Sequence, residues 1–238
     1  MHVSVNELTL VSQKAALGAG VTEGAAEDLG NAAVWLGLRG FSAVEAVHDA
    51  LLGARRGKAV YGNATLSGPR VQWGPVQTGR ALSAAMVGGA AADLFSLVRK
   101  AEGGFACMRE LDVPLLQLAG FAKSAGKLSF QTIVRWFNRD SEIAFCMQGG
   151  SLRILAEKGT PYAGGPFQFE ASCQEAGWRV DHEKSIPEVP ENNGMYLYGY
   201  EVDEKIWYEL KQLADLILVE PTERSRALGA RPGLTDND

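Results

Sequence analysis

The spacing of apolar residues changes along this chain, and that change limits the folds it can form. Near the start, Leu8, Val11 and Ala15 recur at the three- to four-residue spacing of an amphipathic helix. From residue 127 onward apolar and polar residues alternate, most clearly over residues 130–137, which is the spacing of a strand. A chain that begins with helices and continues with strands predicts an α+β fold.

Start and stop signals divide the first part into three helices. Ser4 and Glu7 have the spacing of a capping box, in which two side chains satisfy free backbone N–H groups, and Ser42 and Glu45 repeat it. Thr22 is the expected cap of the middle helix. Glycines at residues 18, 20, 40 and 57 mark the expected helix ends.

The rest of the chain is expected to form a sheet and a final helix. Short turns separate the later apolar segments and favour antiparallel strands; we expect strands over residues 70–73, 130–137, 142–147, 152–155, 167–172, 178–182 and 195–202, and further helices over 90–100 and 115–123. A long helix from Asp203 to Ile217 is expected to pack on this sheet.

We therefore predict a single domain over residues 1–238. Its helical part spans residues 1–126, and antiparallel strands with a C-terminal helix span residues 127–230. Residues 231–238 are polar and acidic, which predicts an extended tail.

Composition excludes several classes of function. The 238 residues carry 23 basic and 28 acidic side chains, a net charge of −5, which gives no basic footprint for nucleic acid. The first ten residues lack the pattern of a secretory signal, and no apolar run is long enough for a membrane span. We expect a cytoplasmic protein that binds neither nucleic acid nor membrane.

Known cofactor and metal motifs fail at particular residues. The glycines of residues 18–24 follow a predicted helix, whereas a dinucleotide loop follows a strand. Residues 53–58 have glycines one position too close for a phosphate loop, and Ala59 replaces the required Ser or Thr. Three cysteines without a Cys-x-x-Cys pair disfavour zinc and a disulfide framework. We expect no cofactor and no metal.

One segment has the donors of an anion site. Thr222 is a predicted helix cap, and Arg224, Ser225 and Arg226 lie in the turn that follows. Helix N-terminal amides beside two guanidinium groups suit a carboxylate or a phosphate. Alternatively, the arginines pair with the neighbouring acids of residues 220–223.

Other candidates lie apart from this segment. His48, on the edge of an apolar helix face, is either a general base at a cleft or a half-buried structural histidine. His48 and Arg39 are secondary candidates for binding the anion. Tyr196, Tyr198 and Tyr200 share one strand face, which either packs on a helix or receives a planar ligand.

The N-terminal residues resemble a known enzyme family. Residues 3–8, 19–21 and 38–40 are similar to the start of the malate and L-lactate dehydrogenase type that lacks a Rossmann fold. In that family a histidine-containing loop follows the Arg-Gly pair and carries catalysis. Residues 40–44 here contain no histidine, and the family's glycine-rich nicotinamide features are missing downstream. The resemblance implies a similar local structure over residues 3–40.

A second resemblance extends over the chain. Residues 4–7, 33–36, 113–116 and 222–238 together are similar to an uncharacterised bacterial family of unknown function. This resemblance implies a bacterial protein and supplies no catalytic residues.

These observations favour a non-catalytic subunit or a small-molecule-binding protein. Its partners would be a small anionic metabolite, a second copy of the chain in a homodimer, or another protein. The alternative is an enzyme that acts on a small carboxylate- or phosphate-bearing metabolite.

Overall fold

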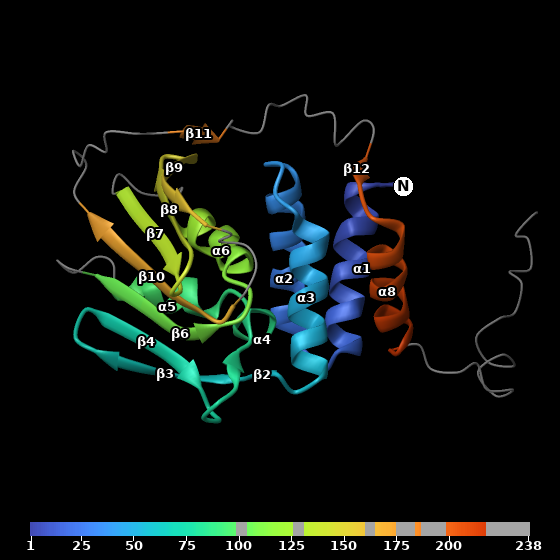
Figure 1. The fold of residues 1–238 in the computed structure, drawn as a ribbon, viewed down its shortest axis with the longest axis horizontal. Helices are drawn as coiled ribbons and strands as arrows, with labels where there is room; N and C mark the ends of the chain where they lie inside the picture. Colours follow the sequence, from blue (N-terminus) through green and yellow to red (C-terminus); the bar gives the residue numbers. More distant parts are fainter. Residues whose placement is uncertain (99–103, 126–130, 160–164, 175–183, 187–198, 218–238) are drawn as a thin grey trace, which may run out of the picture.

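A computed structural model describes residues 1–98, 104–125, 131–159, 165–174, 184–186 and 199–217. A group of long helices stands beside a large sheet, and shorter helices pack on one face of that sheet (Figure 1). The helices are α1 (Val5–Gly18), α2 (Glu23–Gly37), α3 (Ala43–Arg55), α4 (Ala84–Val87), α5 (Ala90–Val98), α6 (Leu115–Ala125) and α8 (Glu204–Asp215). This arrangement confirms the predicted α+β class.

The strands form one long sheet and one short pair. They are β1 (His2–Val3), β2 (Ala59–Val60), β3 (Gly62–Ser67), β4 (Arg70–Pro75), β5 (Ala81–Leu82), β6 (Phe105–Leu111), β7 (Gln131–Phe137), β8 (Glu142–Gln148), β9 (Ser151–Lys158), β10 (Phe167–Gln174), β11 (Lys184–Ile186) and β12 (Tyr200–Glu201). The order in the long sheet is β11-β9-β8-β7-β10-β6-β4-β3, and β5 pairs with both β2 and β6.

The sheet is mixed rather than purely antiparallel. Strands β6 to β10 pair antiparallel where they are neighbours, as expected. However, β4 and β5 each pair parallel with β6, and β2 pairs parallel with β5. All of these parallel strands precede residue 127, so strands and helices alternate within the part that was expected to be helical.

The strand expected over residues 130–137 is confirmed as β7, although residues 131–134 are all buried rather than alternately buried and exposed. Val134 and Trp136 on β7 are fully buried. The Trp136 ring stacks on Phe169 of β10 at 6.2 Å, and Phe121 of α6 packs on Phe169 at 5.2 Å. This part of the hydrophobic core lies between the sheet and helices α5 and α6, and the same core continues between helices α1, α2, α3 and α8.

The last helix packs elsewhere than expected. Helix α8 lies on α1 and α3, so the prediction that it covers the sheet is wrong (Figure 1). The short β1–β12 pair explains this position, because it places the start of α8 beside the N-terminus, where the Met1 ammonium donates to Val202 O at 3.0 Å. Gly18 allows the close approach, since a Cβ there would collide with the carbonyl oxygen of Leu213.

The predicted N-cap residues of α1, α2 and α3 are confirmed, but only one of them makes the expected side-chain hydrogen bonds. Ser4 and Glu7 form both hydrogen bonds of a capping box at α1. Thr22 and Ser42 are N-caps, but neither side chain makes a capping hydrogen bond. The second predicted capping box is therefore wrong: Ser42 has a ψ of 71° rather than the extended value that its counterpart Ser4 has.

Some predictions lie outside the described residues. The strand expected over residues 178–182, most of that expected over 195–202 and the tail at 231–238 cannot be compared with the structure. Among the described residues, no helix combines the length and the apolar character needed to cross a membrane.

Candidate active site

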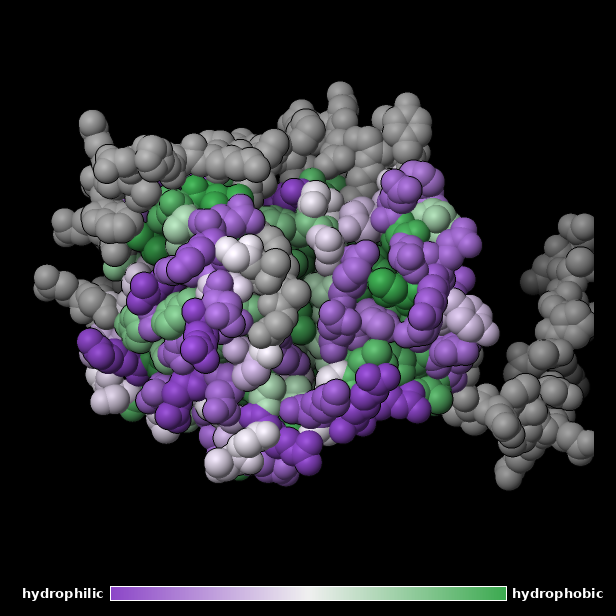
Figure 2. Space-filling view, viewed as in Figure 1, coloured by the Kyte–Doolittle hydropathy of each residue, from purple (hydrophilic) through white to green (hydrophobic). Residues whose placement is uncertain are grey.

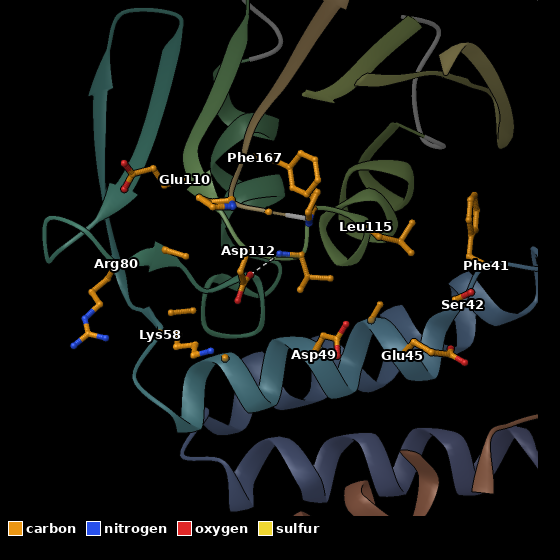
Figure 3. A pocket seen from close by; sticks show the side chains of 18 of the residues that line it. Phe41, Ser42, Glu45, Asp49, Lys58, Arg80, Glu110, Asp112, Leu115 and Phe167 are labelled. Carbon is orange, nitrogen blue, oxygen red and sulfur yellow. Dashed lines mark hydrogen bonds between the residues drawn. The ribbon is translucent and has the colours of Figure 1, made fainter. Parts of the chain in front are cut away.

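A pocket of about 930 Å³ lies between α3 and the sheet part of the molecule. Its lining comes from residues between 40 and 59 along and around α3, residues 79–81 before and within β5, residues between 110 and 115 at the end of β6 and beyond it, and residues 165–167 at the start of β10. Ile154 and Glu157 of β9 complete it. Figure 3 shows α3 as its floor, and Figure 2 shows hydrophilic side chains over much of the visible surface of the molecule. We call this space the α3–β6 pocket.

Parallel pairing of three short segments assembles one end of the pocket. The backbone N–H of Ala81 donates to Lys58 O at 3.0 Å, and the N–H of Asp112 donates to Leu82 O, also at 3.0 Å. Lys58 and Arg80 precede β2 and β5, whereas Asp112 follows the C-terminal end of β6. All three residues line the pocket, and the Arg80 side chain extends away from Asp112 (Figure 3).

Asp112 is a buried carboxyl with an incomplete set of partners. Its Oδ1 accepts hydrogen bonds from the N–H groups of Ala84 and Val113, each at 2.7 Å. Its Oδ2 is buried and has no hydrogen-bond partner among the described residues. Burial raises the pKa of Asp112 to about 6, and the two backbone donors limit that rise. A carboxyl with this pKa can accept or donate a proton near neutral pH.

Two glycines lie close to this buried carboxyl. A Cβ at Gly53 of α3 would lie 3.5 Å from Asp112 Oδ2 and 3.7 Å from the Ala59 Cβ. On the other side, a Cβ at Gly165 would lie 2.7 Å from the carbonyl oxygen of Asp112, so the chain can pass there only as glycine. The backbone around Asp112 is therefore tightly enclosed, while its free oxygen faces α3.

The pocket holds both signs of charge. Lys58 and Arg80 are exposed, and neither has an ion-pair partner in the part of the chain that the structure describes. The carboxylates of the lining are those of Glu45, Asp49, Glu110, Asp112 and Glu157. Glu110 has a φ of +57°, an uncommon conformation for a residue other than glycine that is found more often at functional sites.

Tyr200 forms hydrogen bonds with the backbone next to the pocket, at residues 41 and 43. Its hydroxyl donates to Phe41 O at 2.7 Å and accepts from the Ala43 N–H at 3.3 Å. Burial raises the pKa of the Tyr200 hydroxyl, so it remains protonated and able to donate. Of the three tyrosines predicted to share a strand face, Tyr196 and Tyr198 lie outside the described residues.

His48 lies on another face of α3. Its Nε2 is 2.7 Å from Glu209 Oε2 on α8, and its Nδ1 is 3.3 Å from Asp49 Oδ1. The side chain is 11% exposed and is not part of the lining of the α3–β6 pocket. This geometry favours the reading of His48 as a half-buried structural histidine.

Arg39 also lies off the lining of this pocket. Its guanidinium stacks 4.0 Å from the centre of the Trp35 ring, and its Nη1 donates to Trp35 O at 3.2 Å. The structure therefore brings neither His48 nor Arg39 to Asp112.

The four residues of the predicted anion site, Thr222, Arg224, Ser225 and Arg226, lie outside the described residues. Their role remains a prediction.

Sequence reasoning missed Asp112, although a signal was present. Asp112 stands between Leu111 and Val113 and just before Pro114, so a charged residue interrupts an apolar run at a strand end. Lys58 and Gly53 belong to the run that failed as a phosphate loop. Neither pattern indicates that these residues meet, because the parallel pairing that joins them involves strands of two residues.

Part of the chain matches a known protein family, and most of it is similar in fold to solved structures. Residues 3–104 match a family described as "Protein of unknown function (DUF3726)". No curated protein matches the chain. The resemblance to a family of unknown function is thus confirmed over the N-terminal part.

Solved dehydrogenases and a reductase share the fold. A dehydrogenase from Sinorhizobium meliloti is 12% identical, with a TM-score of 0.65 over 90% of this chain and 99% of the other. Malate dehydrogenase from Pyrococcus horikoshii OT3 is 11% identical, with a TM-score of 0.61 over 92% and 96%. Δ1-piperideine-2-carboxylate reductase from Pseudomonas syringae pvar. tomato is 9% identical, with a TM-score of 0.59 over 90% and 99%. The chain is therefore similar to a family of unknown function over residues 3–104, and its fold is similar to that of malate/lactate dehydrogenase-like structures well beyond the expected residues 3–40.

Proposed function

We propose that this protein is an enzyme that acts on a small carboxylate-bearing metabolite in the α3–β6 pocket. The observation that carries the proposal is Asp112: a buried carboxyl with a pKa near 6 and an unpartnered oxygen, in the wall of a pocket large enough for a metabolite. The non-catalytic reading depended on the absence of an acid–base group, and Asp112 supplies one. The fold, which several solved dehydrogenases share, also favours the enzyme.

In this proposal the two cations of the pocket attract the substrate carboxylate. The ammonium of Lys58 binds it, and the guanidinium of Arg80 adds a second positive charge. The segment of Lys58 bonds to β5, and β5 bonds to the strand of Asp112. In this arrangement Asp112 accepts or donates the proton.

A nicotinamide dinucleotide, which a dehydrogenase fold implies, does not fit the described lining. Its two phosphates are anionic, whereas the lining carries five carboxylates and two cations. The chemistry proposed here is therefore proton transfer by Asp112, with no step assigned to a nicotinamide.

Solvent exchange tests this proposal. The protein is incubated in D₂O with a panel of small 2-oxo, 2-hydroxy and 2-amino carboxylates, and exchange next to the carboxylate is followed by proton NMR. We expect exchange with wild type, at least a 100-fold slower rate with Asp112→Asn, and weaker binding with Lys58→Ala and Arg80→Ala. Equal exchange by wild type and Asp112→Asn, or no exchange with any compound, overturns the proposal.

A further inference from the structure

We propose that strand β3 is the surface through which two copies of this chain pair, so that the sheet of one copy continues into the sheet of the other. The proposal goes beyond the proposed function, because β3 contributes no residue to the lining of the α3–β6 pocket. It begins from the position of β3 at one end of the long sheet.

The outer side of β3 is open. The strand pairs with β4 on one side and ends the sheet on the other, where no described element covers it (Figure 1). The side chains of residues 63–67 are all exposed. An edge of this kind presents a row of free N–H and C=O groups to which another strand can bond.

The pairing with β4 shows which backbone groups are free. The N–H of Val76 donates to Tyr61 O at 3.0 Å, and the register continues without a shift along the whole of β3. In an antiparallel pair the backbone groups of alternate residues point to the same side. Alternate residues from Tyr61 onward therefore face β4, whereas the N–H and C=O groups of Ala64 and Leu66 point outward.

β3 lacks the features that keep exposed edges from pairing. Those features are short length, proline, charged side chains and bulges. The opposite end of the sheet has two of them, since β11 has three residues and begins with Lys184. β3 has six residues, contains neither a charged residue nor proline, and pairs with β4 without a bulge. Its edge is therefore able to accept another strand.

Exposed apolar side chains are concentrated near this edge. Among the described residues, three of the nine large apolar side chains that are exposed belong to residues 61–76. Leu66 is 64% exposed, although Val71, which lies opposite on β4 and on the same face of the sheet, is 1% exposed. A strand added beside β3 extends this face and removes part of Leu66 from water.

The occupant that fits is a second copy of β3. When residues 63–67 of two copies align antiparallel, Leu66 of each copy lies opposite Ala64 of the other, and the two Thr65 side chains meet at the two-fold axis. Their outward N–H and C=O groups then bond across the axis in both directions. No like charges are brought opposite each other, although each chain carries a net charge of −5. Both β3 edges are used in this pairing, so it closes as a dimer.

Sedimentation of the full chain over a dilution series tests the proposal. We expect wild type to sediment with twice the chain mass of 25.5 kDa and to dissociate on dilution. Leu66→Lys places a charge on the edge of both copies and is expected to raise the dissociation constant at least about 10-fold. Leu97→Lys, the same change at a position of α5 that is 71% exposed, is the matched control and should leave the dimer unchanged. A wild type that is monomeric at every concentration, or equal dissociation constants for the two variants, overturns the proposal.

Amide exchange of the wild-type protein locates the interface without any variant. The N–H groups of Ala64 and Leu66 are expected to exchange more slowly at high protein concentration than at low concentration. Those of Asn63 and Thr65, which bond to β4, are expected to be protected at both. If the exchange of Ala64 and Leu66 is independent of concentration while the protein is dimeric, the copies meet elsewhere and the proposal fails.

Discussion

His48 Nε2 and Glu209 Oε2 lie 2.7 Å apart, although 161 residues separate them in the chain. The contact joins α3 to α8, the helix that the sequence pattern assigned to the sheet. It also gives His48 a partner away from the lining of the α3–β6 pocket. A titratable residue on an apolar helix edge can thus serve the packing of helices rather than a reaction.

Removal of this contact is expected to destabilise the protein without affecting ligand binding. Glu209→Ala leaves His48 without its partner on α8 and should cost about 1 kcal/mol of unfolding free energy, the usual net value of a partly exposed hydrogen bond. Urea unfolding measures this loss. Lys211→Ala, an exposed change on the same helix, is the control. A loss of ligand affinity in Glu209→Ala, with the fold intact, would argue for a direct role of this pair in binding.

The raised pKa of Asp112 predicts an unusual dependence of stability on pH. Folding raises this pKa from 3.8 to about 6, so the folded state binds the proton more tightly than the unfolded state. The contribution of Asp112 to stability therefore falls as the pH rises from about 4 to about 6, by about 3 kcal/mol in total.

Asp112→Asn removes this dependence, because the amide oxygen can still accept from Ala84 and Val113 but does not ionise. We expect the variant to gain stability relative to wild type at pH 7.5 and to differ little from it near pH 4. Denaturant unfolding at both pH values measures the difference. The same difference between variant and wild type at both pH values would show that Asp112 does not titrate in this range.

Two glycine substitutions are expected to have opposite effects. Gly18→Ala places a Cβ against the carbonyl oxygen of Leu213 and should cost about 1–3 kcal/mol, despite the better helix propensity of alanine. Gly24→Ala, at an open position of α2, should stabilise by up to about 1 kcal/mol. Thermal unfolding of both variants checks the pair. Stabilisation by Gly18→Ala would mean that α8 does not approach α1 so closely.

The caps of α1 and α2 give a further matched pair. Ser4→Ala removes a side-chain acceptor that bonds the N–H of Glu7 and should cost about 1 kcal/mol. Thr22→Ala should cost clearly less, because the Thr22 side chain makes no capping bond. Urea unfolding distinguishes them, and equal losses would contradict the difference in capping.

Ser4 and Trp136 show what the sequence alone can predict. A capping box and an alternating strand depend on neighbours within a few residues, so the pattern specifies the structure directly. The partner of α8 is different: its apolar face fits α1 as well as a sheet, and the β1–β12 pair that decides between them has only two residues in each strand. Local patterns therefore identify elements better than they identify contacts between elements.

The candidate site follows the same rule. His48 and Arg39 are predicted as candidates because their residue types are familiar in catalysis and anion binding. The pocket is instead lined by Asp112, Lys58 and Arg80. The segments that carry these three residues are joined by the pairing of β2, β5 and β6, and no local pattern indicates that pairing. The burial that raises the pKa of Asp112 likewise depends on segments as distant as Gly165.

The late position of Gly165–Phe167 in the lining has a consequence for synthesis of the protein. A ribosome completes α3 and Asp112 long before it reaches these residues and α8, so an emerging chain cannot yet hold a metabolite in the finished pocket. The ligand is therefore unable to assist the N-terminal helices during translation. Any stabilisation by a ligand of this pocket begins only once residues 165–167 have left the ribosome.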